Sequence, residues 1–137
     1  MPFVLDASVT MAWAFDDESH PVATLALARM SNDQVWVPAI WWYEVRNALL
    51  VSEWNERSTQ SRSDVLLRYL SDLPVLIDES PEEETVFQMA RKHHLSFYDA
   101  TYLELALRNQ VALATLDRKL RIAARKESVE TLQAAGR

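Results

Sequence analysis

Cysteine is absent from the 137-residue chain, and glycine occurs once, at Gly136. Without cysteine, neither a disulfide framework nor a thiolate metal site can form, so any bound metal must use oxygen or imidazole ligands. Glycine-rich phosphate cradles such as the P-loop and the dinucleotide fingerprint are also excluded, because they need glycine where the backbone approaches a phosphate. These absences remove most nucleotide-cofactor interpretations of an α/β chain.

Long apolar segments are lacking as well. No stretch approaches the roughly 20 apolar residues that a membrane-spanning helix needs, and residues 1–6 lack the basic start and long apolar run of a signal peptide. We therefore expect a cytoplasmic protein with no membrane partner. The formal net charge of −6 argues against a general nucleic-acid coat protein, which usually carries a basic excess. An acidic total still permits a local basic patch, and it fits a cluster of carboxylates that binds a metal ion.

Apolar runs suited to buried strands alternate with segments whose apolar residues have helical spacing. We predict strands at residues 3–5, 35–37, 75–77 and 111–116, with a weak last strand at 129–132. Helices are predicted at residues 8–15, 21–30, 39–57, 61–70, 81–92, 97–109 and 118–125, with an acidic turn at 16–18. No repeat or linker interrupts this alternation. We therefore expect one domain over residues 1–137, a three-layer α/β/α sandwich with a short, mainly parallel central sheet.

Four acidic residues are placed at one edge of this predicted sheet. Asp6 directly follows the first strand, and Asp117 directly follows the fourth. Glu44 lies in the early turns of the helix after the second strand, and Asp99 lies in the first turn of the helix that precedes the fourth strand. A helix that returns the chain to the start of a parallel strand begins at the carboxyl edge, where sites of parallel sheets gather. All four acids are therefore expected at the carboxyl edge.

The two helical acids also share faces with apolar side chains. Glu44 lies on a stripe with Ile40 and Val51, and Asp99 lies on a stripe that includes Tyr102. A carboxylate on a buried stripe is costly unless a cation or hydrogen-bond donors compensate it. The pattern therefore favours a compensated carboxylate cluster.

Each acid also has a purely structural alternative. Asp6 and Asp117 can cap the helices that follow them, Asp99 can interact with the dipole of its helix, and Glu44 can extend into solvent. For all four to be structural, unrelated reasons would have to converge on one sheet edge. We therefore favour a shared site.

Three polar residues are positioned to support the acids. Ser8 follows Asp6 by two residues, and it can donate to that carboxylate or cap the following helix. Asn47 lies one helical turn after Glu44. Thr115 lies two residues before the last of the four acids, so both face the same side of an extended segment. We expect these three residues to form hydrogen bonds around the acids.

A basic cluster follows the last acid at once, in an otherwise acidic chain. Arg118, Lys119 and Arg121 can hold RNA phosphates, and the structural alternative is a solvated helix face. Elsewhere, Glu104 and Arg108 have i,i+4 spacing and are expected to pair on the solvent side. The tryptophans offer faces for base stacking, but core packing or a dimer face is the preferred interpretation for most of them.

Four segments carry a resemblance to a known family. They are VLDAS at residues 4–8, EVRNAL at 44–49, YDATYL at 98–103 and LATLDRKL at 113–120. In this order and spacing they resemble the PIN-domain nucleases, and within them the VapC-type toxins of bacterial toxin–antitoxin pairs. The resemblance implies a homodimer that cleaves RNA with Mg²⁺ or Mn²⁺ and is inhibited by a small antitoxin. It assigns the family's acidic residues to Asp6, Glu44, Asp99 and Asp117, with Thr115 or Ser8 assisting.

The proposed chemistry also follows from the residue types. Hard divalent ions prefer carboxylate oxygens and retain water molecules, and bound Mg²⁺ can acidify an attacking water and neutralise charge on a phosphate. We assign direct metal contacts to Asp6 and Asp99. Glu44 and Asp117 are expected to bind through water, hold a second ion or orient the nucleophile.

Two other functions are considered. A haloacid-dehalogenase-like phosphatase needs a second acid two residues after the first, where this chain has Ser8, and a receiver domain needs paired acids where it has Pro2 and Phe3. A catalytically inactive PIN-like interaction module is the alternative from a different class. The presence of all four acids argues against it.

Overall fold

The computed structural model describes residues 1–15 and 20–133, so the predicted acidic turn at 16–18 lies outside the described residues. The strands are β1 (Phe3–Leu5), β2 (Val35–Pro38), β3 (Val75–Asp78) and β4 (Ala112–Ala114). The helices are α1 (Ala7–Ala12), α2 (Pro21–Arg29), α3 (Ala39–Trp54), α4 (Gln60–Ser71), α5 (Glu83–His93), α6 (Phe97–Asn109) and α7 (Arg118–Lys126).

The strands form one parallel sheet in the order β3-β2-β1-β4. Val4 of β1 pairs with Trp36 of β2 on one side and with Leu113 of β4 on the other. Of the two shortest strands, β1 therefore lies inside the sheet and β4 lies at its edge. All three residues of β1 are fully buried, as a continuous apolar run in a doubly covered parallel strand predicts. The backbone N–H of Asp6 donates to the carbonyl of Ala114 at 3.0 Å, which extends the pairing to the carboxyl edge.

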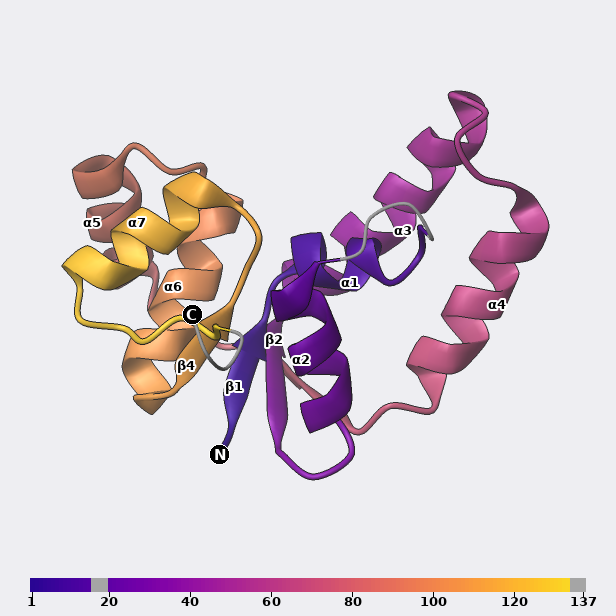
Figure 1. The fold of residues 1–137 in the computed structure, drawn as a ribbon. Coiled ribbons are helices and arrows are strands. Elements are labelled where there is room, and N and C mark those ends of the chain that lie inside the picture. Colours follow the sequence, from indigo (N-terminus) through magenta and orange to yellow (C-terminus); the bar gives the residue numbers. More distant parts are fainter. Residues whose placement is uncertain (16–19, 134–137) are drawn as a thin grey trace.

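Helices cover both faces of the sheet (Figure 1), with α5, α6 and α7 on one side and α1, α2 and α3 on the other. Figure 1 shows α4 outside the layer that α1, α2 and α3 form, farther from the sheet than α2. This arrangement confirms the predicted α/β/α sandwich with a parallel central sheet. No helix within the described ranges is both long and apolar enough to cross a membrane.

Three helix ends differ from the sequence prediction by two or more residues. α1 ends at Ala12, three residues before its predicted end. α3 ends at Trp54, because Glu56 adopts the left-handed conformation with a φ of 58°. α5 begins at Glu83, two residues later than predicted. Its cap residue Glu82 is extended, and its backbone N–H donates to a carboxylate oxygen of Glu104 at 3.3 Å. Because this long-range contact holds Glu82 in an extended conformation, the helix begins after the position that Pro81 predicts.

The weak last strand predicted at residues 129–132 is reduced to a single bridge between Leu113 and Thr131. The backbone N–H of Leu113 donates to Glu130 at 2.8 Å, and the N–H of Leu132 donates back to Leu113 at 2.9 Å. β4 is only three residues long. Ser128, directly before the segment at 129–132, has a left-handed backbone conformation with a φ of 62°. The segment therefore meets the sheet at one residue and forms no regular strand.

Glu104 and Arg108 pair as predicted, with 2.7 Å between Nε and Oε2. Arg108 is exposed to solvent as predicted, but Glu104 is not. Glu104 is 1% exposed, and Arg108 also binds Asp78 at the end of β3, with 2.8 Å between Nη2 and Oδ2. The solvent prediction was wrong for Glu104, because α6 packs between the sheet and the two helices α5 and α7. Every residue of α6 from 100 to 106 is consequently buried.

Candidate functional site

Asp6 occupies the first position after β1 and is 5% exposed. Two hydroxyls donate to the same carboxylate oxygen: Ser8 Oγ to Oδ2 at 2.6 Å, and Thr115 Oγ1 to Oδ2 at 2.7 Å. Asp6 is the N-cap residue of α1, yet its side chain makes no capping hydrogen bond. The capping alternative therefore does not account for its carboxylate.

Ser8 and Thr115 connect this carboxylate to the turn between β4 and α7. Ser8 Oγ accepts from the backbone N–H of Leu116 at 2.9 Å, and Thr115 Oγ1 accepts from that of Asp117 at 3.0 Å. Asp117 caps α7, because its Oδ1 accepts from the N–H of Leu120 at 3.0 Å. Asp117 therefore acts as a helix cap, which was its structural alternative. The bonds through Ser8 and Thr115 hold the turn between β4 and α7 against the end of β1.

Glu44 lies in the second turn of α3 and is half-buried. The buried face of α3 consists of Trp41, Val45 and Leu49, whereas Val51 is 38% exposed. The predicted stripe was therefore shifted, because α3 packs against β2 and α1 through the neighbouring face. Glu44 lies at the border of the buried face, where its carboxylate can reach both protein donors and solvent.

Tyr102 is the hydrogen-bond partner of Glu44, and no sequence motif had assigned it a role in the site. Its hydroxyl donates to Glu44 Oε1 at 2.5 Å, and its side chain is fully buried. Its only sequence signal is its position three residues after Asp99 on the same helical face. That spacing predicts burial beside the acid but does not identify the partner on another helix.

The pKa values show that the acids act on one another. Burial raises the pKa of Asp6 to about 6, the bonds from Ser8 and Thr115 oppose this rise, and the charges of Glu44 and Asp99 add to it. Burial also raises the pKa of Glu44, where the Tyr102 hydroxyl opposes the rise and the Asp99 charge adds to it.

Asp99 is the third acid of this group, and it is half-buried at the start of α6. Burial and then the charge of Asp117 raise its pKa, whereas Ser96 and the charge of Lys119 lower it. Ser96 also caps α6 by accepting from the N–H of Asp99 at 3.0 Å. Together with the interactions of Asp6 and Glu44, this places the four predicted acids in one electrostatically coupled cluster at the carboxyl edge.

The remaining predicted residues differ in their relation to the acids. Asn47 is exposed, and within the described ranges it makes no hydrogen bond to any of the four acids. On α7, Arg118 and Lys119 are exposed and Arg121 is half-buried. Of these three cations, Lys119 acts on the pKa of Asp99.

The donor set fits a hydrated divalent ion rather than a fully enclosed one. Among the described residues, no group of three or more His, Cys, Asp or Glu side chains is close enough together to hold a metal ion by itself. Mg²⁺ commonly keeps several waters and uses one or two carboxylates. Oxygen donors at an accessible sheet edge, with buried Asp6 held by two hydroxyls, match that requirement.

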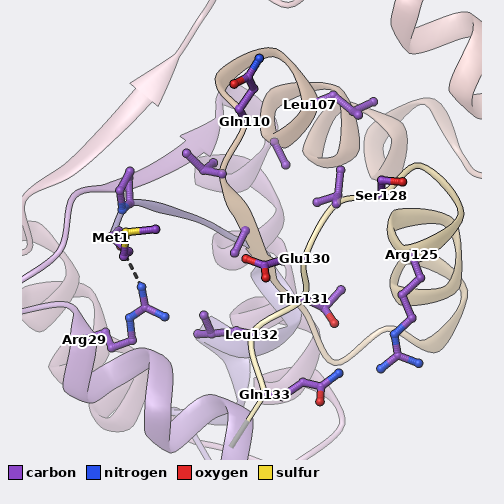
Figure 2. Close-up of a pocket in the computed structure, with 15 residues that line it drawn as sticks. Met1, Arg29, Leu107, Gln110, Arg125, Ser128, Glu130, Thr131, Leu132 and Gln133 are labelled. Atoms are coloured by element: carbon purple, nitrogen blue, oxygen red, sulfur yellow. Dashed lines mark hydrogen bonds between the residues drawn. The ribbon is translucent and has the colours of Figure 1, made fainter.

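A cavity of about 880 Å³ lies elsewhere (Figure 2), between the chain start, the beginning of β4 and the segment from Ser128 to Gln133. None of the four acids lines it. Figure 2 shows Arg29 joined to Met1, whose carbonyl it binds at 2.8 Å. This cavity is therefore separate from the carboxylate cluster.

The family model of the PIN domain matches residues 3–126. The chain belongs to the PIN domain family. The matched range includes all four acids of the cluster and the polar residues around Asp6. No curated protein matches the chain.

Solved structures resemble this PIN domain over most of its length. PAE2754 from Pyrobaculum aerophilum is 26% identical, with a TM-score of 0.68 over 90% of this chain and 79% of that chain. VapBC2 from Rickettsia felis, bound to a DNA fragment from their promoter, is 10% identical, with a TM-score of 0.65 over 98% of both chains. A toxin–antitoxin complex from Klebsiella pneumoniae is 18% identical, with a TM-score of 0.63 over 96% of this chain and 98% of that chain. These similarities support the fold.

Proposed function

We propose that this PIN domain is a Mg²⁺- or Mn²⁺-dependent endoribonuclease that acts as the toxin of a toxin–antitoxin pair. The observation that carries the proposal is the coupling of Asp6, Glu44, Asp99 and Asp117 at one sheet edge. Membership of a family that generally consists of nucleases supports cleavage of a phosphodiester. A concentration of carboxylates with raised pKa values is typical of a site that uses them chemically.

Asp6 and Asp99 would contact the ion directly, and Glu44 and Asp117 would bind its waters or a second ion. When bound, Mg²⁺ would supply a more acidic water and a counter-charge for the scissile phosphate. Cation binding would also remove the cost of ionising Asp6 in a buried position. Metal binding would therefore favour the ionised forms of the clustered acids.

The polar residues around Asp6 would fix its orientation. Ser8 and Thr115 both donate to Oδ2, and within the described ranges no hydrogen bond reaches Oδ1. Oδ1 would accordingly be the oxygen that faces the ion. Hydrogen bonds of this kind to a ligating carboxylate typically change metal affinity 10- to 100-fold.

RNA phosphates would be held by the cations of α7. Arg118, Lys119 and Arg121 begin directly after Asp117, which caps the same helix. Lys119 is the cation whose charge reaches Asp99, so it would bind a phosphate next to the acids. A local basic segment of this kind compensates for the acidic total charge of the chain.

An antitoxin would be the protein partner. One of the similar structures is a toxin–antitoxin complex, which supports this assignment by fold. An apolar groove of about 480 Å³ between α1, α2 and α4, lined by Trp13, Leu27, Val65 and Leu66 among others, would suit an apolar segment of such a partner. We also expect a homodimer, for which the exposed Trp54 and Tyr43 on α3 offer apolar contact area.

The alternatives make different predictions from the same residues. An inactive interaction module would need neither four coupled acids nor a metal ion, and replacing any one acid would leave its partner binding intact. A phosphatase would need a second carboxylate where Ser8 stands, but Ser8 donates to Asp6 and accepts from Leu116. The nuclease assignment uses all of these contacts.

The test uses labelled single-stranded RNA and DNA of identical sequence, incubated with the purified protein in Mg²⁺, in Mn²⁺ and in EDTA. We expect internal cleavage of RNA that requires the ion, little cleavage of DNA, and no release of phosphate from a phosphomonoester. Cleavage of DNA alone, hydrolysis of the monoester or activity in EDTA would contradict the proposal.

A further inference from the structure

Tyr102 joins the two helices that carry Glu44 and Asp99. It belongs to α6, three residues after Asp99, and its hydroxyl reaches Oε1 of Glu44 on α3 at 2.5 Å. The two partners are 58 positions apart in the sequence, so the contact depends on the packing of the helices against the sheet. A short hydrogen bond from a hydroxyl to a carboxylate belongs to the strong, charge-assisted class.

The phenol group has few other states available to it. Tyr102 is fully buried, and burial raises its pKa, with the charges of Asp6 and Glu44 adding to the rise. The nearby backbone of Ala7, the residue after Asp6, acts on the pKa in the opposite direction. The hydroxyl therefore remains protonated at working pH, and it donates its proton to the carboxylate of Glu44.

We propose that Tyr102 is a positioning residue whose hydroxyl holds Glu44 Oε1 and thereby turns Oε2 toward the divalent ion or its waters. The proposal rests on the proposed metal-dependent function of this cluster. Glu44 is half-buried and has a flexible side chain. Without a fixed oxygen it would sample rotamers that leave the site, and each ordered rotamer costs conformational entropy.

The alternative is a core tyrosine that simply satisfies its own hydroxyl, since buried polar groups require partners. The two roles differ in whether the Tyr102 hydroxyl changes the metal affinity of Glu44. A satisfied core tyrosine stabilises the fold whether or not a metal is bound. A positioning tyrosine changes metal affinity, and it does so only while Glu44 carries a carboxylate.

The experiment measures Mn²⁺ affinity by electron paramagnetic resonance and calorimetry for wild type and Tyr102→Phe, each with Glu44 intact or changed to Ala. Tyr98→Phe is the matched control, because Tyr98 is on the same helix beside Asp99 and is 56% exposed. With Glu44 intact, Tyr102→Phe should weaken Mn²⁺ binding 10- to 100-fold. In the Glu44→Ala background it should have no further effect, and Tyr98→Phe should bind Mn²⁺ as wild type does.

RNA cleavage supplies a second readout. In Tyr102→Phe, the Mg²⁺ concentration for half-maximal cleavage should rise by the same factor as the Mn²⁺ dissociation constant. If Tyr102→Phe does not fold, Glu44→Asp tests the contact from the other side, because it keeps the charge but withdraws the carboxylate from the hydroxyl. Weaker Mn²⁺ binding by Glu44→Asp is then expected, and unchanged binding overturns the proposal.

Failure of the positioning role is distinguishable from failure of the proposed function. If wild type binds Mn²⁺ and Asp6→Asn does not, but Tyr102→Phe binds as wild type, only the role of Tyr102 is overturned. An equal loss of affinity in both Glu44 backgrounds also overturns it and assigns Tyr102 to the fold. If wild type and Asp6→Asn both fail to bind Mn²⁺, the metal site and the positioning role are overturned together.

Discussion

Thr115 and Asp6 lie 109 positions apart in the sequence, yet Thr115 Oγ1 donates to Asp6 Oδ2 at 2.7 Å. The same oxygen of Thr115 accepts from the backbone N–H of Asp117 at 3.0 Å. One hydroxyl therefore links the acid after β1 to the acid that caps α7. This link, together with the bonds of Ser8 to Asp6 and Leu116, fixes the relative position of these two acids.

Replacing this hydroxyl by a methyl group should weaken both the fold and the site. Thr115→Val leaves the buried carboxylate of Asp6 with one donor fewer and the Asp117 N–H without its acceptor, at a cost of roughly 1–3 kcal/mol. It should also lower Mn²⁺ affinity 10- to 100-fold. Urea denaturation and calorimetry measure the two effects.

Thr101→Val is the control for this variant. Thr101 is also buried, at 7% exposed, but its hydroxyl donates to the backbone carbonyl of Tyr98 within α6. It should lose about 1 kcal/mol or less and bind Mn²⁺ normally. Equal metal affinities for the Thr115 and Thr101 variants would remove Thr115 from the site.

Divalent ions should stabilise the folded protein. A ligand at 100 times its dissociation constant adds about 2.7 kcal/mol to the free energy of unfolding, and thermal denaturation with and without Mg²⁺ measures the gain. The shift should vanish in the double variant Asp6→Asn, Asp99→Asn. A shift of the same size in that double variant would place the binding site elsewhere.

The metal-free protein should lose stability as the pH rises from about 4 to 6. The folded-state pKa of Asp6 is raised from 3.8 to about 6, so in this window the folded protein retains a proton that the unfolded chain has lost. The stabilisation is complete below pH 3.8 and lost above about 6. This difference corresponds to about 3 kcal/mol at most, and the raised pKa values of Glu44 and Asp99 act in the same direction.

Urea denaturation in EDTA between pH 4 and 8 checks this dependence. Asp6→Asn should flatten the slope and make the metal-free protein more stable than wild type at neutral pH. Asp64→Asn, at an exposed position on α4, should leave the slope unchanged. A wild-type slope in Asp6→Asn would mean that another group titrates.

The cations of α7 should govern RNA affinity. Removing a side chain that binds one phosphate should reduce the salt slope of single-strand binding by roughly 0.7. Arg118 and Lys119 are adjacent and diverge by about 100° on the helix. Because the charge of Lys119 reaches Asp99, we expect Lys119→Gln to have the larger effect of the two.

Binding is measured over a salt series in the inactive Asp6→Asn background, with Lys119→Gln, Arg118→Gln and Arg121→Gln compared individually. Arg68→Gln, at an exposed position on α4, is the control. If the α7 variants keep the affinity and slope of their parent, RNA enters from another side and the cluster is a solvated helix face.

The positions of the acids could be predicted because topology alone determines them. Asp6 follows a buried strand, and Asp99 begins a helix that returns to the next parallel strand, so both must lie at the carboxyl edge. The bond from Ser8 to Asp6 was one of the two roles expected of Ser8, since the two residues are near in sequence. These inferences need only the order of elements and local spacing.

Contacts between helices could not be predicted in this way. Glu104 was expected in solvent because its i,i+4 pairing suggested an exposed face, but its carboxylate is buried and accepts from the backbone N–H of Glu82, the cap residue of α5. The bond from Tyr102 to Glu44 joins two helices whose relative rotation depends on packing against the sheet. A one-dimensional pattern gives the buried face of a helix but not its partner.

RNA cleavage as a function of Mg²⁺ concentration, compared between wild type, Asp6→Asn and Asp99→Asn, tests the central claim most directly. The account predicts saturable, Mg²⁺-dependent cleavage by wild type and a loss of activity of at least about 100-fold in each variant. Both variants should melt no lower than wild type in EDTA, because removing one charge relieves repulsion within the cluster. Cleavage at the wild-type rate by either variant would contradict the assignment of these carboxylates as the active site. A loss of cleavage that results only from unfolding of the variant would contradict it as well.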